Sequence, residues 1–142
     1  MKTSDREIVF NKFGGKCAYC GTELVKGWHV DEVEPVRRYR EHLRDEFGNK
    51  IWNPNKNDYE TKQVVSHPER FNLDNQNPSC ASCNINKHSE SLEDFRKNIK
   101  AYMKHLNEIN TQYKIAKRYG LVTENNIEVK FYFETLTDNK PK

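Results

Sequence analysis

The chain has 142 residues, with 24 lysines and arginines against 21 aspartates and glutamates and a formal net charge of +3. This length allows one domain, or one domain with an appendage, and the near balance of charge excludes a heavily basic coat, so any contact with nucleic acid must come from a local patch. Because no apolar run fits a signal peptide or a membrane span, we expect a cytoplasmic protein with no membrane partner.

The N-terminal quarter predicts one helix and one strand. Ser4 to Glu7 has the form of a capping box, which predicts a short helix that stops at Gly14. The apolar residues of this helix are Ile8, Val9, Phe10 and Phe13. Residues 28–33 predict a short strand whose direction ends at Pro35.

The next segment, residues 37–70, is charged, aperiodic and interrupted by Asn, Pro and Gly residues. Such a composition is typical of solvated loops, so we expect a long surface insertion that could hold one short helix near residues 39–47.

The C-terminal part predicts two helices and a strand. Ser91 predicts the N-cap of an amphipathic helix, and a second helical stretch over residues 109–119 ends at Gly120. Apolar residues that alternate with charged residues and Tyr132 over 127–134 predict a half-buried terminal strand. The expected fold class is α+β, with one domain over residues 1–98 and a helical and strand extension over 99–142 packed on it. The helix predicted after Ser91 has apolar residues at helical spacing, namely Leu92, Phe95, Ile99, Met103 and Leu106.

The four cysteines form two pairs, Cys17 with Cys20 and Cys80 with Cys83, each with two residues between them. This spacing places both sulfurs of a pair on one side of a tight turn, and two such turns can enclose Zn²⁺ in a tetrahedron. Two disulfides are the alternative, which a reducing compartment disfavours. Four thiolates would fill the coordination sphere, so the zinc would be structural and would stabilise a core that is small in so polar a chain.

The segments around these cysteines resemble a known family. They read VDEVEP at residues 30–35, and NQNPSCASCNINKH at residues 75–88 with SLEDFR shortly after. With the first cysteine pair, they resemble the HNH endonuclease family in its four-cysteine zinc form, over about residues 14–98. The resemblance implies a ββα-metal core, in which two strands and a helix surround one catalytic divalent ion and DNA phosphodiester bonds are cut.

Hydrolysis of a phosphodiester needs an activated water and a cation near the phosphate. The resemblance implies that Asp31 and Asn84 bind Mg²⁺, Mn²⁺ or another divalent ion. His88 is a further candidate, because residues four apart on a helix point the same way. Asn75 is implied to hold the base and the local backbone. Taken alone, Asn75 and Asn84 would more often be turn caps, and Asp31 an ordinary surface carboxylate.

Glu32 stands where the family has its histidine general base. A glutamate is a weaker base than a histidine near neutral pH, because the reference pKa values are about 4.3 and 6.5. Glu32 could act as the base in a buried setting, it could bind the ion beside Asp31, or the site could be disabled. His29 is another candidate base, since it lies two residues before Asp31 on the same strand face.

Three basic residues, Arg37, Arg38 and Lys87, lie near the predicted site, and we expect them to contact DNA phosphates. The sequence thus predicts a metal-dependent HNH-type endonuclease from a phage, a mobile element or a defence system. One alternative is a zinc module that binds nucleic acid without cutting it, and another is a zinc-scaffolded protein-interaction domain. The part beyond Phe95 could set specificity, support a homodimer or only cover the core.

Overall fold

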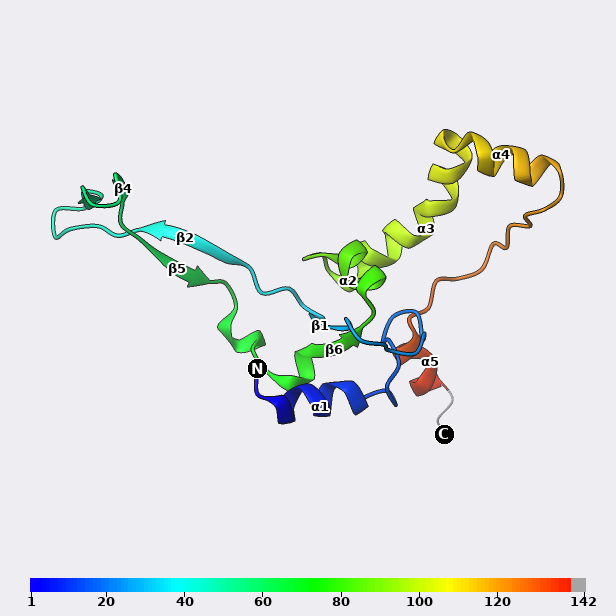
Figure 1. Cartoon of the computed structure of the whole chain (residues 1–142), viewed down its shortest axis with the longest axis horizontal. Coiled ribbons are helices and arrows are strands. Elements are labelled where there is room, and N and C mark those ends of the chain that lie inside the picture. The colour runs from blue at the N-terminus through cyan, green and yellow to red at the C-terminus, as the bar shows by residue number, and fades with distance from the viewer. Residues whose placement is uncertain (139–142) are drawn as a thin grey trace.

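The computed structural model describes residues 1–138, and residues 139–142, the end of the predicted extension, lie outside the described residues. Helices and small antiparallel sheets are mixed, as the α+β class predicts. Figure 1 shows a small body from which two arms diverge, one built from β2 and β5 and the other from α3 and α4. In chain order the elements are α1 (Thr3–Asn11), β1 (His29–Glu32), β2 (Arg38–His42), β3 (Trp52–Asn53), β4 (Asp58–Tyr59), β5 (Thr61–Val65), the 3-10 turns η1 (Pro68–Arg70) and η2 (Leu73–Asn75), β6 (Gln76–Ser79), α2 (Ala81–Lys87), α3 (Leu92–Ile109), α4 (Thr111–Arg118) and α5 (Tyr132–Asp138).

The body is organised by β1 and β6, which pair antiparallel with Asp31 opposite Asn77. Helix α2 follows β6 directly, so two strands and a helix form one continuous unit although the strands are far apart in the sequence. The predicted strand over residues 28–33 is confirmed as β1. The predicted first helix is present as α1, but its capping box is wrong, because the helix begins at Thr3 and contains both Ser4 and Glu7.

The core is a small aromatic cluster beside the cysteines. Tyr19 packs edge-to-face against Phe95 and Phe131, with ring centroids 5.7 and 5.4 Å apart, and the two phenylalanines stack on each other at 5.5 Å. Such ring pairs stabilise a core beyond the area that they bury. Helix α3 supplies Phe95 and runs unbroken through the predicted boundary between residues 98 and 99.

The predicted insertion over residues 37–70 lies mostly at the surface, but it is not an irregular loop, and the short helix predicted near 39–47 is wrong. Residues 38–65 form a β-hairpin in which β2 pairs with β5 and β3 with β4. At its far end Tyr59 makes edge contacts with His42 and Trp52. Every residue of β2 is exposed, so the sequence lacks the alternation of apolar and polar residues by which a half-buried strand is recognised.

The predicted terminal strand over residues 127–134 is also wrong. Residues 127–130 have no regular structure, and α5 begins at Tyr132. The Glu134 carboxylate accepts a hydrogen bond from the N–H of Phe131, as a residue in the first turn of a helix does when it caps the start. The backbone N–H groups of Tyr132 and Phe133 donate to Tyr19 and Ala18, which attaches the C-terminal segment to the first cysteine turn.

Truncating Phe131 should therefore destabilise the whole body. Phe131→Ala should lower the free energy of unfolding by about 3–5 kcal/mol, because a fully buried ring is removed from the core. Ile127→Ala is the matched control and should change it by less than about 0.5 kcal/mol, since Ile127 is 74% exposed. Thermal or urea unfolding followed by circular dichroism measures both. Equal losses would mean that the two side chains share a buried strand face, as the sequence predicted.

Candidate metal centre and neighbouring cleft

The two cysteine pairs meet in space. The Sγ atoms of Cys17, Cys20, Cys80 and Cys83 all lie within 4.8 Å of one another, and the four cysteines are free, so the disulfide alternative is wrong. A tetrahedron with metal–sulfur bonds of about 2.3 Å has sulfur–sulfur edges of about 3.8 Å. The Sγ atoms of Cys20 and Cys80 are 3.8 Å apart. These four cysteines could hold a metal ion such as zinc.

Local backbone geometry forms each cysteine turn. Gly21 closes the first turn by donating its N–H to the carbonyl of Cys17, and it has a φ of +74° with the ring of Tyr132 only 3.0 Å from where a Cβ would lie. Only glycine combines that conformation with that approach. Cys80 is the N-cap of α2, where its sulfur accepts from the N–H of Cys83, and Ala18 donates to the carbonyl of Pro78 at 2.8 Å. Hydrogen bonds therefore hold the turns together beside the sulfurs.

The crowded thiols perturb one another. A hydrogen bond with the Cys83 thiol lowers the pKa of Cys17 to about 4. The same hydrogen bond, followed by burial, raises the pKa of Cys83, and burial raises that of Cys20. One thiolate is thus stabilised at the expense of its neighbours. A dication at the centre would stabilise all four thiolates together, which is the usual effect of a coordinated metal on thiols.

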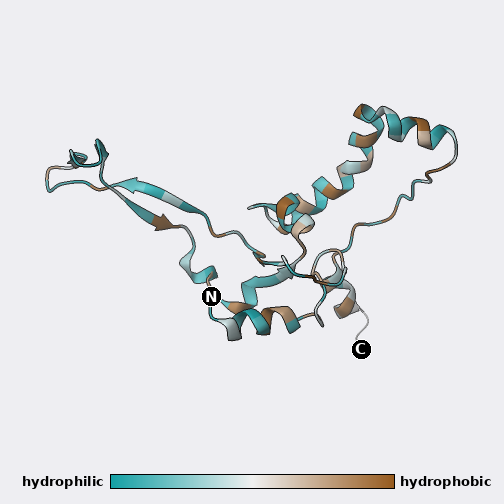
Figure 2. Ribbon diagram, in the orientation of Figure 1, coloured by the Kyte–Doolittle hydropathy of each residue, from teal (hydrophilic) through white to brown (hydrophobic). Residues whose placement is uncertain are grey.

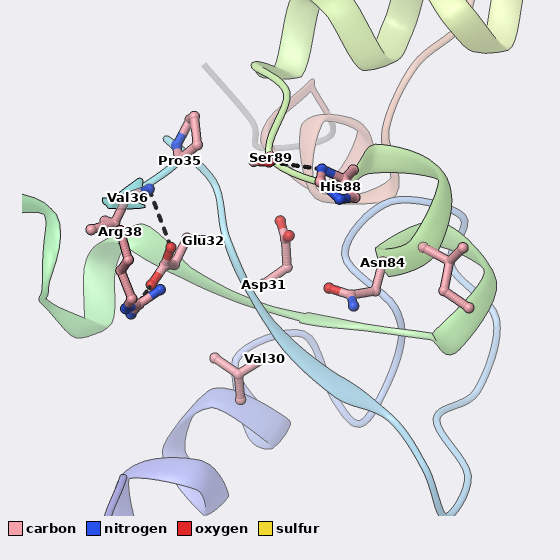
Figure 3. Close-up of a pocket in the computed structure, with 10 residues that line it drawn as sticks. Val30, Asp31, Glu32, Pro35, Val36, Arg38, Asn84, His88 and Ser89 are labelled. Atoms are coloured by element: carbon pink, nitrogen blue, oxygen red, sulfur yellow. Dashed lines mark hydrogen bonds and ion pairs between the residues drawn. The ribbon is translucent and has the colours of Figure 1, made fainter. Parts of the chain in front are cut away.

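A cleft of about 550 Å³ lies next to this centre, between β1 and α2 (Figure 3). It brings together five of the predicted site residues, Asp31, Glu32, Arg38, Asn84 and His88. The other residues that line it are Val30, Pro35, Val36, Ile85 and Ser89.

Asp31 is the most buried carboxylate of the cleft, with 5% of its surface exposed. The Tyr19 hydroxyl donates to its Oδ2 atom, and the Lys87 ammonium lies 3.1 Å from the same oxygen. Burial raises the pKa of Asp31 above its ordinary value, and the contacts with Tyr19 and Lys87 oppose that shift. Because both contacts use Oδ2, Oδ1 is the oxygen that can serve a ligand in the cleft, into which the carboxylate points in Figure 3.

Tyr19 is a site residue that was not predicted from the sequence. It lies inside the first cysteine turn, its ring belongs to the core, and its hydroxyl reaches Asp31. Burial, reinforced by the charge of Asp31, raises the pKa of Tyr19, so the phenol stays protonated and acts as a donor. The available signal was an aromatic residue between the two cysteines, since a buried tyrosine needs a partner for its hydroxyl.

The predicted DNA contact by Lys87 is wrong. This last residue of α2 is fully buried, and its ammonium donates to the carbonyl of Glu32 at 2.9 Å besides pairing with Asp31. A side chain with no exposed surface cannot contact a phosphate. Lys87 instead ties α2 to the end of β1.

Asn84 and His88 both line the cleft, but they do not share a helix. Asn84 lies in α2, whereas His88 follows the end of that helix with a φ of +52°. The Nδ1 atom of His88 is 2.7 Å from the Ser89 hydroxyl, so a metal would be bound through Nε2. Figure 3 shows the side chains of Asn84, His88 and Asp31 turned toward the same space.

Glu32 lies on the cleft wall and is already engaged. Its carboxylate accepts from the N–H of Val36 at 3.2 Å and pairs with Arg38 at 3.4 Å. The Arg38 guanidinium lies over the ring of Phe71, with 5.2 Å to the ring centroid. His29 is exposed at the start of β1 and does not line the cleft.

Asn75 and Arg37 lie outside the cleft. The Asn75 amide donates to the carbonyls of Glu34 and Arg70 and accepts from the N–H of Glu34. Its side chain thus fixes the backbone just after Glu32. Arg37 is exposed at the base of the hairpin, where its N–H donates to the hydroxyl of Ser66.

Comparison of the chain with protein-family models, with curated proteins and with solved structures found no match. Within residues 1–138, every helix is too short or too polar to cross a lipid bilayer. A functional assignment must therefore come from the residues of the site and their chemistry.

Proposed function

We propose that this chain is a metal-dependent endonuclease of the HNH type that hydrolyses DNA phosphodiester bonds in the cleft between β1 and α2. The observation that carries the proposal is the convergence of Asp31, Asn84 and His88 on one cleft beside the cysteine cluster (Figure 3). Two antiparallel strands followed by a short helix, as formed by β1, β6 and α2, fit the ββα-metal core that the sequence resemblance implies.

The two proposed metal sites have different donors. The four cysteines would hold a structural zinc, whereas Asp31, Asn84 and His88 offer a carboxylate oxygen, an amide oxygen and an imidazole nitrogen, a set that suits Mn²⁺ or a related divalent ion. Such an ion, when bound, polarises a water molecule and offsets negative charge on the phosphate. Tyr19 and Lys87 fix the Asp31 carboxylate from behind, at its Oδ2 atom.

The charges of the cleft balance before DNA arrives. Asp31 is paired with Lys87, and Glu32 with Arg38. A divalent ion therefore meets little net negative charge in the free protein. The phosphate of a bound DNA strand supplies that charge, so ion binding and DNA binding should strengthen each other.

Glu32 is proposed to position Arg38 rather than to accept the proton from water. Its carboxylate is held by two donors, one of them the Arg38 guanidinium, and that guanidinium has further N–H groups for a phosphate. Asn75, through its hydrogen bonds to Glu34, positions the backbone that carries this pair.

Nicking of supercoiled plasmid in Mg²⁺ or Mn²⁺ tests the proposal. Asp31→Asn should lower the nicking rate by at least about 100-fold, as expected when a group that stabilises transition-state charge is lost. Glu32→Gln should lower it by less than about 10-fold, whereas loss of a general base would cost about 10²–10⁴-fold. Circular dichroism and zinc content must first show that both variants are folded, because Asp31→Asn leaves the buried Lys87 ammonium without its carboxylate. Nicking by Asp31→Asn at the wild-type rate, or no nicking by a zinc-loaded wild type, would refute the proposal.

The second candidate function is a DNA-binding module of the same fold that does not cut. The observation that favours it is that Asp31 and Glu32 each already face a cationic side chain. Duplex binding by the wild type without nicking in Mg²⁺, Mn²⁺, Co²⁺ or Ni²⁺ would establish this alternative in place of the first.

A further inference from the structure

The hairpin arm, residues 38–65, leads away from the body in Figure 1, and its first residue, Arg38, lines the cleft. Its base is fixed. The N–H of Ser66 donates to the carbonyl of Arg37 at 2.9 Å, and the Arg70 guanidinium donates to the carbonyl of Pro35 at 2.8 Å. Since Arg38 both lines the cleft and begins β2, the arm has a defined direction relative to the cleft.

The two faces of the arm differ in charge. Directly opposed residues of an antiparallel pair lie on the same face. One face, called here the basic face, therefore carries two arginines, a histidine and three uncharged residues. The other face places Glu41 opposite Lys62 and Tyr39 opposite Val64, so its charges balance. The basic face consists of Arg38, Arg40, His42, Thr61, Gln63 and Val65.

Side chains at alternate positions of a strand are about 7 Å apart, so Arg38, Arg40 and His42 form a row about 14 Å long. The Nε atom of Arg40 donates to the Thr61 hydroxyl at 2.9 Å, which holds the guanidinium on the basic face. Two of the acidic groups toward the tip are engaged locally: Glu60 pairs with Lys56, and Asp45 accepts from two backbone N–H groups of its own turn.

The hairpin arm contributes little to the buried core of the protein, so stabilisation of the fold does not account for it. All five residues of β2 are exposed, and Figure 2 shows the strand as hydrophilic along its length. A two-stranded hairpin is marginally stable in water. Here the aromatic contacts of Tyr59 with Trp52 and His42 stabilise a ribbon that covers little of the core.

We propose that the hairpin arm lies in the major groove of duplex DNA, with its basic face against the phosphates that border the groove. The B-form major groove is wide enough for a two-stranded ribbon. Arg40 carries the positive charge that a phosphate attracts, Arg38 has N–H groups beyond the one that it donates to Glu32, and His42 adds a ring N–H donor. This inference rests on the proposed function, because Arg38 belongs to the same cleft. The arm would fix where along the duplex the cleft meets its phosphate.

Arg40→Gln and its cross-face control Lys62→Gln test this placement, since each removes one positive charge from the same ribbon. Fluorescence anisotropy with the full chain and a labelled duplex of about 20 base pairs, without added Mg²⁺ or Mn²⁺, gives affinity over a range of salt concentrations. Arg40→Gln should weaken binding by about 3- to 10-fold and reduce the slope of log affinity against log salt by about 1. Lys62→Gln should stay within about 2-fold of wild type. Equal effects of the two variants, or none, would overturn the inference.

Plasmid nicking separates this inference from the proposed function. If the wild type binds and cuts DNA but the two variants behave alike, the arm inference fails and the nuclease proposal stands. If Arg40→Gln alone loses affinity and the wild type does not cut, the arm inference stands and the nuclease proposal fails. Equal affinity for a duplex RNA of the same sequence would overturn the groove placement, because the A-form major groove is too narrow for side chains to read.

Discussion

The Cys80→Ser variant should purify without zinc and should lose its cooperative unfolding transition at room temperature. Binding of structural zinc contributes about 10–16 kcal/mol in small metal-dependent domains, whereas a whole domain is stable by only about 5–15 kcal/mol. In this chain the aromatic core is built directly on the cysteine cluster, through Cys17 and Tyr19 in one turn and the packing of Phe95 and Phe131 against them. Losing one thiolate should therefore remove most of the stability.

Ser82→Ala is the matched control, because Ser82 lies between Cys80 and Cys83 and its side chain is exposed. It should keep one zinc per chain and a wild-type melting curve. Metal analysis by mass spectrometry and thermal unfolding by circular dichroism read out both variants. A Cys80→Ser protein that is zinc-free and folded would show that contacts such as the hydrogen bond from Ala18 to Pro78 suffice to join the turns.

The fold was predictable where the signal was local. Two cysteines separated by two residues specify a turn whatever follows, and Ser91 is the observed N-cap of α3, where its hydroxyl accepts from the N–H of Asp94. The hairpin arm gave no such signal, since both of its faces meet solvent. The alternation over residues 127–134 was misleading. Only Phe131 of its first five residues is buried, and it lies just before the start of α5 instead of in a strand.

The candidate site was predictable in its convergence but not in its contacts. Asp31 and Asn84 each follow or flank a cysteine turn, so the meeting of the two turns brings both residues to one cleft. The sequence shows that Lys87 is positively charged but not that it is buried. A lysine beside a predicted site is equally consistent with a contact to a DNA phosphate and with a buried ion pair to a carboxylate. Lys87 contacts Asp31 and the carbonyl of Glu32 because the tertiary fold packs α2 against β1.

The second large effect is expected at Lys87. Lys87→Met keeps the length of the side chain but leaves the buried Asp31 carboxylate without its cation, which should cost about 3–5 kcal/mol of unfolding free energy. Lys97→Met, on the exposed face of α3, removes the same charge and should change stability by less than about 0.5 kcal/mol. Urea unfolding at neutral pH measures both variants.

A double-mutant cycle shows whether the loss comes from the pair. Asp31→Asn combined with Lys87→Met should be clearly less destabilised than the sum of the single variants, because no charge is then left buried and unpaired. Additive losses would mean that Lys87 acts through packing alone.

The same variants also test the proposed catalytic ion. In the Lys87→Met protein a divalent cation at Oδ1 could replace the missing ammonium, so Mn²⁺ should restore part of its stability by binding the folded state. It should not do so in the double variant, where the carboxylate that would attract the ion is gone, and restoration there would place the ion at other residues than Asp31.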